Sequence, residues 1–121
     1  MVLCFSTMKR IEAIIQEDKL SIVVDALKTT GVGGVTIMQS RGIGAGERPI
    51  IGGARGTSKR VAPFNRLCTI LVIIDDAKVS SVVSSIMDAA HTGKAGDGKI
   101  FITNVEEAFD IATKESGKDI I

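Results

Sequence analysis

Residues 67–104, LCTILVIIDDAKVSSVVSSIMDAAHTGKAGDGKIFITN, contain a strand, a helix and a strand in succession and decide the fold. Residues 67–74 form an almost continuous apolar run, which predicts a buried strand. Serines then alternate with apolar residues that recur at helical spacing and share one helix face: Val79, Val82, Val83, Ile86, Met87 and Ala90. Residues 99–104 predict the second strand.

The first part of the chain repeats this order. Residues 9–15 predict a strand, and a helix follows whose apolar face consists of Leu20, Val23, Val24 and Leu27. Asp18 is the expected N-cap of this helix, Gly31 its terminator, and residues 35–40 the next strand. A strand–helix–strand unit written twice predicts an α+β ferredoxin-like double β-α-β sandwich, with an antiparallel sheet and both helices on one face. We expect a short helical turn and a tail after Val105.

Length and composition fit a single soluble domain. The chain has 121 residues, is 45% hydrophobic and 24% charged, and carries a net charge of +1, which gives no reason to expect a nucleic-acid partner. No Trp or Tyr is available for base stacking. Cys4 and Cys68 do not look like a disulfide pair, and the short apolar start lacks the basic region of a signal peptide. We therefore expect a cytoplasmic protein without membrane insertion.

Residues 41–65 connect the two halves without a clear period. Loops of this length are uncommon in compact domains and are usually functional or disordered. The segment is rich in glycine and has one acidic residue, Glu47, against five basic residues: Arg41, Arg48, Arg55, Lys59 and Arg60. The segment is either a solvated insertion or an arm that docks on a partner or closes over an anion. We favour the arm, because a nearly neutral chain concentrates its excess positive charge in this one loop.

The glycine-rich stretch TGKAGDGKIF, residues 92–101, is either a plain turn or a phosphate-binding loop. Gly93, Gly96 and Gly98 can adopt backbone angles closed to other residues, and successive N–H groups in such a turn can bind an anion. Lys94 and Lys99 add positive charge. The order of residues in a Walker loop is absent, so the pattern alone leaves both interpretations open.

Catalytic and metal-binding patterns are not evident in the sequence. The single histidine, His91, ends the second predicted helix, where it is expected to interact with the negative end of the helix dipole. Asp75 and Asp76 lie at a strand-to-helix junction and are interpreted as N-caps. With no nucleophile–base arrangement and no metal-ligand spacing, we expect no metal site and no efficient enzyme.

The stretch TGKAGDGKIF resembles the B-loop of the PII signal-transduction proteins. MKRIEAII, residues 8–15, is similar to their first strand, and GVGGVTIMQSRGIG, residues 31–44, to their second strand and the start of their T-loop. The resemblance extends over residues 8–113. It implies one PII-like domain over residues 8–121, with an extension at 1–7, a T-loop at 41–65 and a B-loop at 92–99.

The resemblance implies a homotrimer that binds ATP or ADP, with Mg²⁺ as a candidate ion, in clefts between subunits. The T-loop would regulate a nitrogen-metabolism target such as an ammonium transporter or an enzyme. By position, the nucleotide-binding residues would be Thr36, Gly42, Gly44, Ile73, Thr92, Gly93, Gly96, Asp97, Gly98 and Lys99, with Ile14 beside the adenine. Partner-binding positions in the loop would be Arg48, Arg55, Lys59 and Arg60.

The chain departs from the family pattern at charged positions. Where the family has an arginine and a glutamine in the T-loop and two C-terminal arginines, this chain has Ala45, Gly46, Asp110 and Ala112. Each lost charge-assisted contact is worth about 1.5–3 kcal/mol. Triphosphate binding should weaken unless Arg41, Arg48 or Lys114 compensates, and a 2-oxoglutarate response is in question. The T-loop also lacks the tyrosine that some relatives modify. Two alternatives follow: an adaptor without a nucleotide response, and a sensor of AMP, ADP or bicarbonate.

Overall fold

The structure is a computed structural model that describes residues 7–44, 50–52, 59–61 and 64–121. Its strands are β1 (Met8–Gln16), β2 (Thr36–Gly42), β3 (Ile50–Gly52), β4 (Lys59–Val61), β5 (Asn65–Asp75) and β6 (Gly98–Val105). Its helices are α1 (Leu20–Lys28) and α2 (Val79–Ala90), and 3₁₀ turns span Glu17–Lys19, Asp76–Lys78 and Lys118–Ile120. None of the helices in the described part of the chain is long and apolar enough to cross a membrane.

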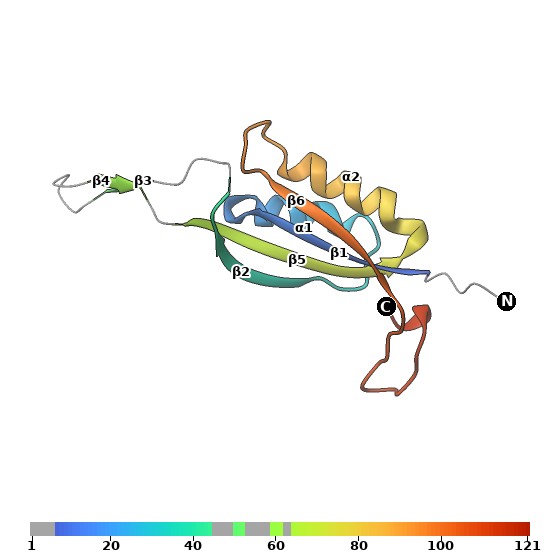
Figure 1. The fold of residues 1–121 in the computed structure, drawn as a ribbon. Helices are drawn as coiled ribbons and strands as arrows, with labels where there is room; N and C mark the ends of the chain where they lie inside the picture. Colours follow the sequence, from blue (N-terminus) through green and yellow to red (C-terminus); the bar gives the residue numbers. More distant parts are fainter. Residues whose placement is uncertain (1–6, 45–49, 53–58, 62–63) are drawn as a thin grey trace.

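Four strands form one antiparallel sheet in the order β2-β5-β1-β6. Both helices cover the same face of this sheet (Figure 1). The two central strands, β1 and β5, are the first strands of the two repeated units, and β2 and β6 lie at the edges. This arrangement confirms the predicted α+β ferredoxin-like sandwich.

The hydrophobic core lies between the helices and one face of the sheet. Alternate residues of the central strands point into it, as the period of two in a strand requires. The helices contribute Val23 and Leu27 from α1, together with Val82 and Ile86 from α2. The buried strand residues are Ile11, Ala13, Ile15, Cys68, Ile70, Val72 and Ile74. The predicted apolar helix faces therefore supply much of the core.

The helix starts differ in part from the sequence-based expectation. Asp18 is not an N-cap, because it lies inside the 3₁₀ turn Glu17–Lys19, and no side chain caps this turn or α1. At the second junction, the Asp75 carboxylate accepts a hydrogen bond from the Ala77 N–H at 3.0 Å and is the N-cap of its 3₁₀ turn, as predicted. Asp76 does not share that role, since it lies within the turn.

The connection between the halves has more structure than its sequence suggests. β2 continues to Gly42 and β5 begins at Asn65, so that Arg41 pairs with Arg66 across the two strands. Within the connection, β3 and β4 form a separate two-stranded antiparallel sheet. Among the predicted partner-binding residues, Lys59 and Arg60 lie in β4. Arg48 and Arg55, like Ala45 and Gly46, lie outside the described residues.

The C-terminal segment after Val105 first forms a closed loop and then the expected short helical turn. Phe109 and Ser116 form an isolated β-bridge, and the Gly117 N–H donates to the Ala108 carbonyl at 3.0 Å. A 3₁₀ turn, Lys118–Ile120, follows this loop. The expected helical turn therefore lies close to the last residue.

Candidate functional site

The glycine-rich loop joins the end of α2 to the start of β6. His91 adopts an extended conformation and ends the helix, and its N–H donates to the Met87 carbonyl at 3.0 Å. The chain then turns back through Gly93 and Gly96, whose φ angles are +86° and +97°. Residues with a Cβ rarely adopt such angles, so glycine is needed for this loop shape.

Gly98 is needed for a second reason, namely its close approach to β1. It pairs with Ile15 and has a φ angle of +118°. A Cβ placed on Gly98 would lie 1.9 Å from the backbone oxygen of Ile14. An ordinary C···O contact is about 3.3–3.6 Å, so no other residue fits here without moving the strand. The absence of a side chain at Gly98 therefore allows the loop to pack directly against β1.

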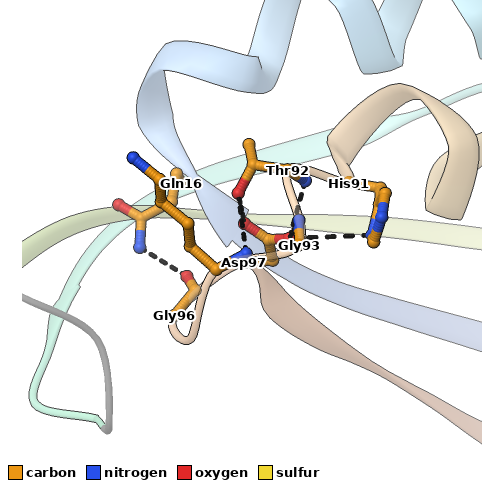
Figure 2. Close-up of polar contacts among 7 residues, drawn as sticks. Gln16, His91, Thr92, Gly93, Gly96 and Asp97 are labelled. Atoms are coloured by element: carbon orange, nitrogen blue, oxygen red, sulfur yellow. Dashed lines mark hydrogen bonds and ion pairs between the residues drawn. The ribbon is translucent and has the colours of Figure 1, made fainter.

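Asp97 points back into its own loop. Its carboxylate accepts hydrogen bonds from the N–H groups of Thr92 at 2.7 Å and Gly93 at 3.0 Å, and from the Thr92 hydroxyl (Figure 2). The His91 Nδ1 atom lies 3.8 Å from the same carboxylate. Hydrogen bonds from Thr92, followed by the Gly93 N–H and the charge of His91, lower the pKa of Asp97 against a smaller opposing effect of desolvation. Asp97 therefore closes the loop in its ionised form.

Gln16, at the end of β1, contacts the loop from outside. Its side-chain amide donates to the Gly96 carbonyl at 2.6 Å (Figure 2). Sequence reasoning did not single out this residue, because the contact joins positions 80 residues apart and depends on the pairing of β1 with β6. Gln16 and Asp97 together fix both halves of the loop.

An open groove of about 390 Å³ lies beside the loop, between α2 and β6. His91, Asp97, Gly98 and Lys99 line its polar end, and the side chains of Met87, Ile100 and Ile102 line its apolar part. Lys94 and Lys99 are both exposed. The loop thus presents two ammonium groups and exposed glycine backbone to solvent.

The other predicted nucleotide-binding residues divide into two groups. Gly42 lies at the end of β2 and, like the glycine-rich loop, at the same end of the sheet, where the chain leads on to Gly44. Thr36 and Ile73 instead line a second groove of about 410 Å³, which also includes Ile120 and Ile121. This groove lies at the β2 side of the sheet, whereas the loop lies at β6. The structure therefore does not bring Thr36 and Ile73 to the loop within one chain.

The C-terminal loop presents no cation at the positions where the PII pattern has arginines. The carboxylate of Asp110 accepts hydrogen bonds from the N–H groups of Ala112 at 2.8 Å and Thr113 at 3.1 Å, so it stabilises its own turn. Lys114 adopts a φ angle of +62°, and Ile111 is 96% exposed. This loop is stabilised by its own hydrogen bonds but is not a basic phosphate clamp.

Metal-binding clusters of three or more His, Cys, Asp or Glu side chains are absent from the residues that the structure describes. Cys68 is a free, buried cysteine in β5, and its burial, with a smaller effect of Glu17, raises the pKa of its thiol. A raised pKa disfavours the reactive thiolate. Cys68 is therefore a core residue, and Cys4 lies outside the described residues.

Fold and loop together define a small ferredoxin-like α+β protein with a glycine-rich loop before its last strand and a long connection between β2 and β5. The family model described as "Nitrogen regulatory protein P-II" matches residues 8–115. The chain belongs to this family of regulatory signalling proteins, as its sequence motifs predict.

Individual relatives agree with this assignment. The chain is 41% identical over 116 residues to the nitrogen regulatory protein P-II of Azospirillum brasilense, covering 94% of this chain and 100% of the relative. It is 40% identical over 114 residues to the nitrogen regulatory protein P-II 2 of Methanothermobacter thermautotrophicus, covering 94% and 97%. The crystal structure of Arabidopsis thaliana PII bound to citrate superposes with a TM-score of 0.75 at 27% identity, covering 95% of this chain and 90% of that chain.

Proposed function

We propose that this protein binds an adenine nucleotide through the loop at residues 92–99 and passes the binding state to a partner protein through the connection at residues 41–65. The observation that carries the proposal is the shape of the loop, which its own glycines and hydrogen bonds define. Its turns are set by Gly93 and Gly96, and Gly98 packs against the backbone of β1. A preformed loop binds its ligand without the entropic cost of ordering the chain.

The chemistry of the loop suits phosphate oxygens. Exposed glycine backbone permits a close approach of the ligand to N–H groups. Lys94 and Lys99 are exposed on the loop and at the start of β6, and they supply positive charge without a fixed bidentate geometry. The apolar groove next to the loop gives the less polar part of a ligand a surface to contact.

We infer that the binding site is completed between subunits of a homotrimer. Thr36 and Ile73 line a groove near one edge of the sheet, and the loop lies at the opposite edge strand, so the two groups can meet only across a subunit boundary. The sheet face without helices also carries half-exposed apolar side chains, among them Met38 at 45% and Phe101 at 49% exposure. Burying such a face against other copies is favourable.

The charges around the site favour a nucleotide with fewer phosphates as a second candidate ligand. Asp110 brings a negative charge to the C-terminal loop, and Ala112 brings none. Arg41 and Arg66 lie opposite each other at the end of the sheet where the loop lies, and they can offset part of that loss. ADP or AMP therefore competes with ATP as the physiological ligand, and bicarbonate is a smaller candidate anion. 2-Oxoglutarate, for which Gly46 replaces a family ligand, is the weakest candidate effector.

Signalling would follow from a shift in the populations of loop conformations. A nucleotide that contacts the base of the connection near Gly42 and Gly44 stabilises those conformations in which its contacts are made. The basic residues of the connection then engage a cytoplasmic or membrane-bound partner, such as a nitrogen-metabolism enzyme or an ammonium transporter. The protein acts as a regulator in the cytoplasm, and any ATP hydrolysis would be slow.

Isothermal titration calorimetry with ATP, ADP and AMP tests the proposal, each with and without Mg²⁺ and 2-oxoglutarate. The proposal predicts saturable binding of at least one nucleotide at one site per subunit. Tight ADP or AMP binding with weak ATP binding would support the second candidate. If none of the nucleotides binds, the proposal is wrong and an adaptor without a nucleotide response is the better description. Sedimentation velocity tests the trimer, and a monomer would exclude a shared site.

A further inference from the structure

A carboxylate in a loop that holds phosphates needs an explanation, because like charges repel each other. Asp97 is the only acidic residue between Thr92 and Lys99. Its side chain is 25% exposed. The position by position resemblance assigns Asp97 to the phosphate cradle, but the geometry gives this carboxylate other partners.

Both carboxylate oxygens of Asp97 are engaged inside the loop. One accepts from the N–H groups of Thr92 and Gly93 at 2.7 and 3.0 Å, and the other accepts from the Thr92 hydroxyl. The Thr92 hydroxyl in turn accepts from the Lys94 N–H at 3.2 Å. These contacts tie the end of the loop to its beginning, so that the segment between them closes into a ring.

Gln16 holds the middle of the loop. Its amide donates to the Gly96 carbonyl at 2.6 Å, directly before Asp97. Gln16 follows Ile15, the residue that pairs with Gly98, so β1 contacts the loop on both sides of Asp97. Figure 2 shows the two anchors on different sides of the loop, Gln16 at Gly96 and the Asp97 carboxylate at Thr92 and Gly93.

We propose that Asp97 and Gln16 are positioning residues, which hold the phosphate loop in its closed shape and do not contact the phosphates or a bound metal ion. This inference rests on the proposed function, because it assigns a role within the same loop. Asp97 satisfies the N–H groups at the start of the loop, so the nucleotide is bound by the glycine backbone and Lys99 at its end. The negative charge is tolerated because three hydrogen bonds from Thr92 and Gly93 stabilise it.

Three variants separate a positioning role from a ligand role. Asp97→Asn keeps the shape and one accepting oxygen, Asp97→Ala removes every acceptor, and Asp88→Asn makes the same charge change on the exposed surface of α2. Affinities for ADP and ATP are measured by calorimetry with and without Mg²⁺. We expect Asp97→Ala to weaken binding at least ~10-fold, because charge-assisted hydrogen bonds are lost. Asp97→Asn should stay within about 3-fold of wild type, as the loop keeps its shape, with an unchanged Mg²⁺ dependence, and Asp88→Asn should match wild type.

A ligand role predicts a different pattern. If Asp97 coordinated Mg²⁺, Asp97→Asn would lose as much affinity as Asp97→Ala, and the Mg²⁺ dependence would disappear. Wild-type affinity in Asp97→Ala would also overturn the proposal. Gln16→Glu replaces the donor with an acceptor of the same size facing the Gly96 carbonyl. It should weaken binding, whereas unchanged affinity would exclude Gln16 as an anchor.

Amide hydrogen exchange in the absence of ligand tests the same inference independently of nucleotide binding. The Thr92 and Gly93 amides should exchange at least ~10-fold faster in Asp97→Ala than in wild type, because their acceptor is gone. Amides in β1 and β5 should keep their protection, which shows that the variant is folded. If the Thr92 and Gly93 amides exchange at the wild-type rate, the positioning role is wrong. If wild type binds no nucleotide while these amides respond as expected, the proposed function fails and the role of Asp97 in shaping the loop stands.

Discussion

Replacement of Gly98 by alanine tests how the loop is joined to the sheet. The new methyl group would lie 1.9 Å from the Ile14 carbonyl oxygen and 3.2 Å from the Ile15 Cα, and both of these are backbone atoms. Backbone cannot rotate away as a flexible side chain can. β6 must therefore move away from β1 at this point, and the loop must move with it.

The cost of this change has two parts. The φ angle of +118° at Gly98 is unfavourable for alanine, and left-handed conformations cost roughly 1–2 kcal/mol per residue. Separation of the strands weakens ladder hydrogen bonds between β6 and β1, at about 0.5–1.5 kcal/mol each. We expect Gly98→Ala to lower the free energy of unfolding by about 2–4 kcal/mol, in the range of strongly destabilising substitutions.

Urea unfolding followed by far-UV circular dichroism measures this effect, since the chain has no Trp or Tyr for fluorescence. All variants are compared at one protein concentration, because assembly couples stability to concentration. Gly34→Ala is the matched control: a Cβ at Gly34 meets nothing within 4 Å, and its φ angle is not in the left-handed region. This control should unfold within about 1 kcal/mol of wild type. Equal stability of Gly98→Ala and Gly34→Ala would refute the close contact between the loop and β1.

Three further predictions concern stability. Asp75 caps a 3₁₀ turn, and the hydrogen bond from the Ala77 N–H is the main cause of its lowered pKa. The Asp75 carboxylate therefore stabilises the fold fully above its unfolded-state pKa of about 3.9, and this stabilisation is lost as the pH falls through the lower folded-state pKa. Asp75→Ala should be less stable than wild type to urea at pH 7, and the difference should shrink below pH 4. A difference that does not depend on pH would contradict this. Lys114→Gly should leave the free energy of unfolding, measured by thermal unfolding, unchanged or raise it by up to about 1 kcal/mol. Glycine relieves the φ angle of +62°, but its flexibility in the unfolded chain offsets part of this gain. A clear loss of stability would contradict this backbone conformation. Ile70 is fully buried in the core, so Ile70→Ala should lower the free energy of unfolding in urea by about 2–5 kcal/mol. Ile22 is 50% exposed on α1, so Ile22→Ala should lower it much less. Equal losses in the two variants would contradict the described core.

The core and the order of elements could be predicted from the sequence because burial repeats with a fixed period. Val23 and Leu27 lie four residues apart on α1, and both are buried, as are the alternating residues of β5. The short strands β3 and β4 could not be predicted, since three residues each are too few to show alternation. The prediction that Asp18 is an N-cap was wrong because the chain enters α1 through a 3₁₀ turn, which local composition does not reveal.

The candidate site also contains features that the sequence predicts and features that it does not. The glycine positions follow from the motif, and their positive φ angles are those expected for such a loop. The direction of the Asp97 side chain could not be predicted, because the sequence of the loop is compatible with a carboxylate that points toward a ligand and with one that points into the loop. The contact between Gln16 and the loop depends on the register between β1 and β6, and no local sequence pattern predicts that register. Whether the predicted residues bind a nucleotide stays a prediction.

The most direct test of the central claim is a titration of ¹⁵N-labelled protein with ADP, followed by two-dimensional NMR. If the loop holds the phosphates, the amide resonances of Gly96, Gly98 and Lys99 should show the largest changes and should saturate together, while those of the α1 surface stay in place. Saturation with changes confined to residues outside 92–99 would show that the nucleotide binds elsewhere. An unchanged spectrum at millimolar ADP would contradict nucleotide binding by this loop.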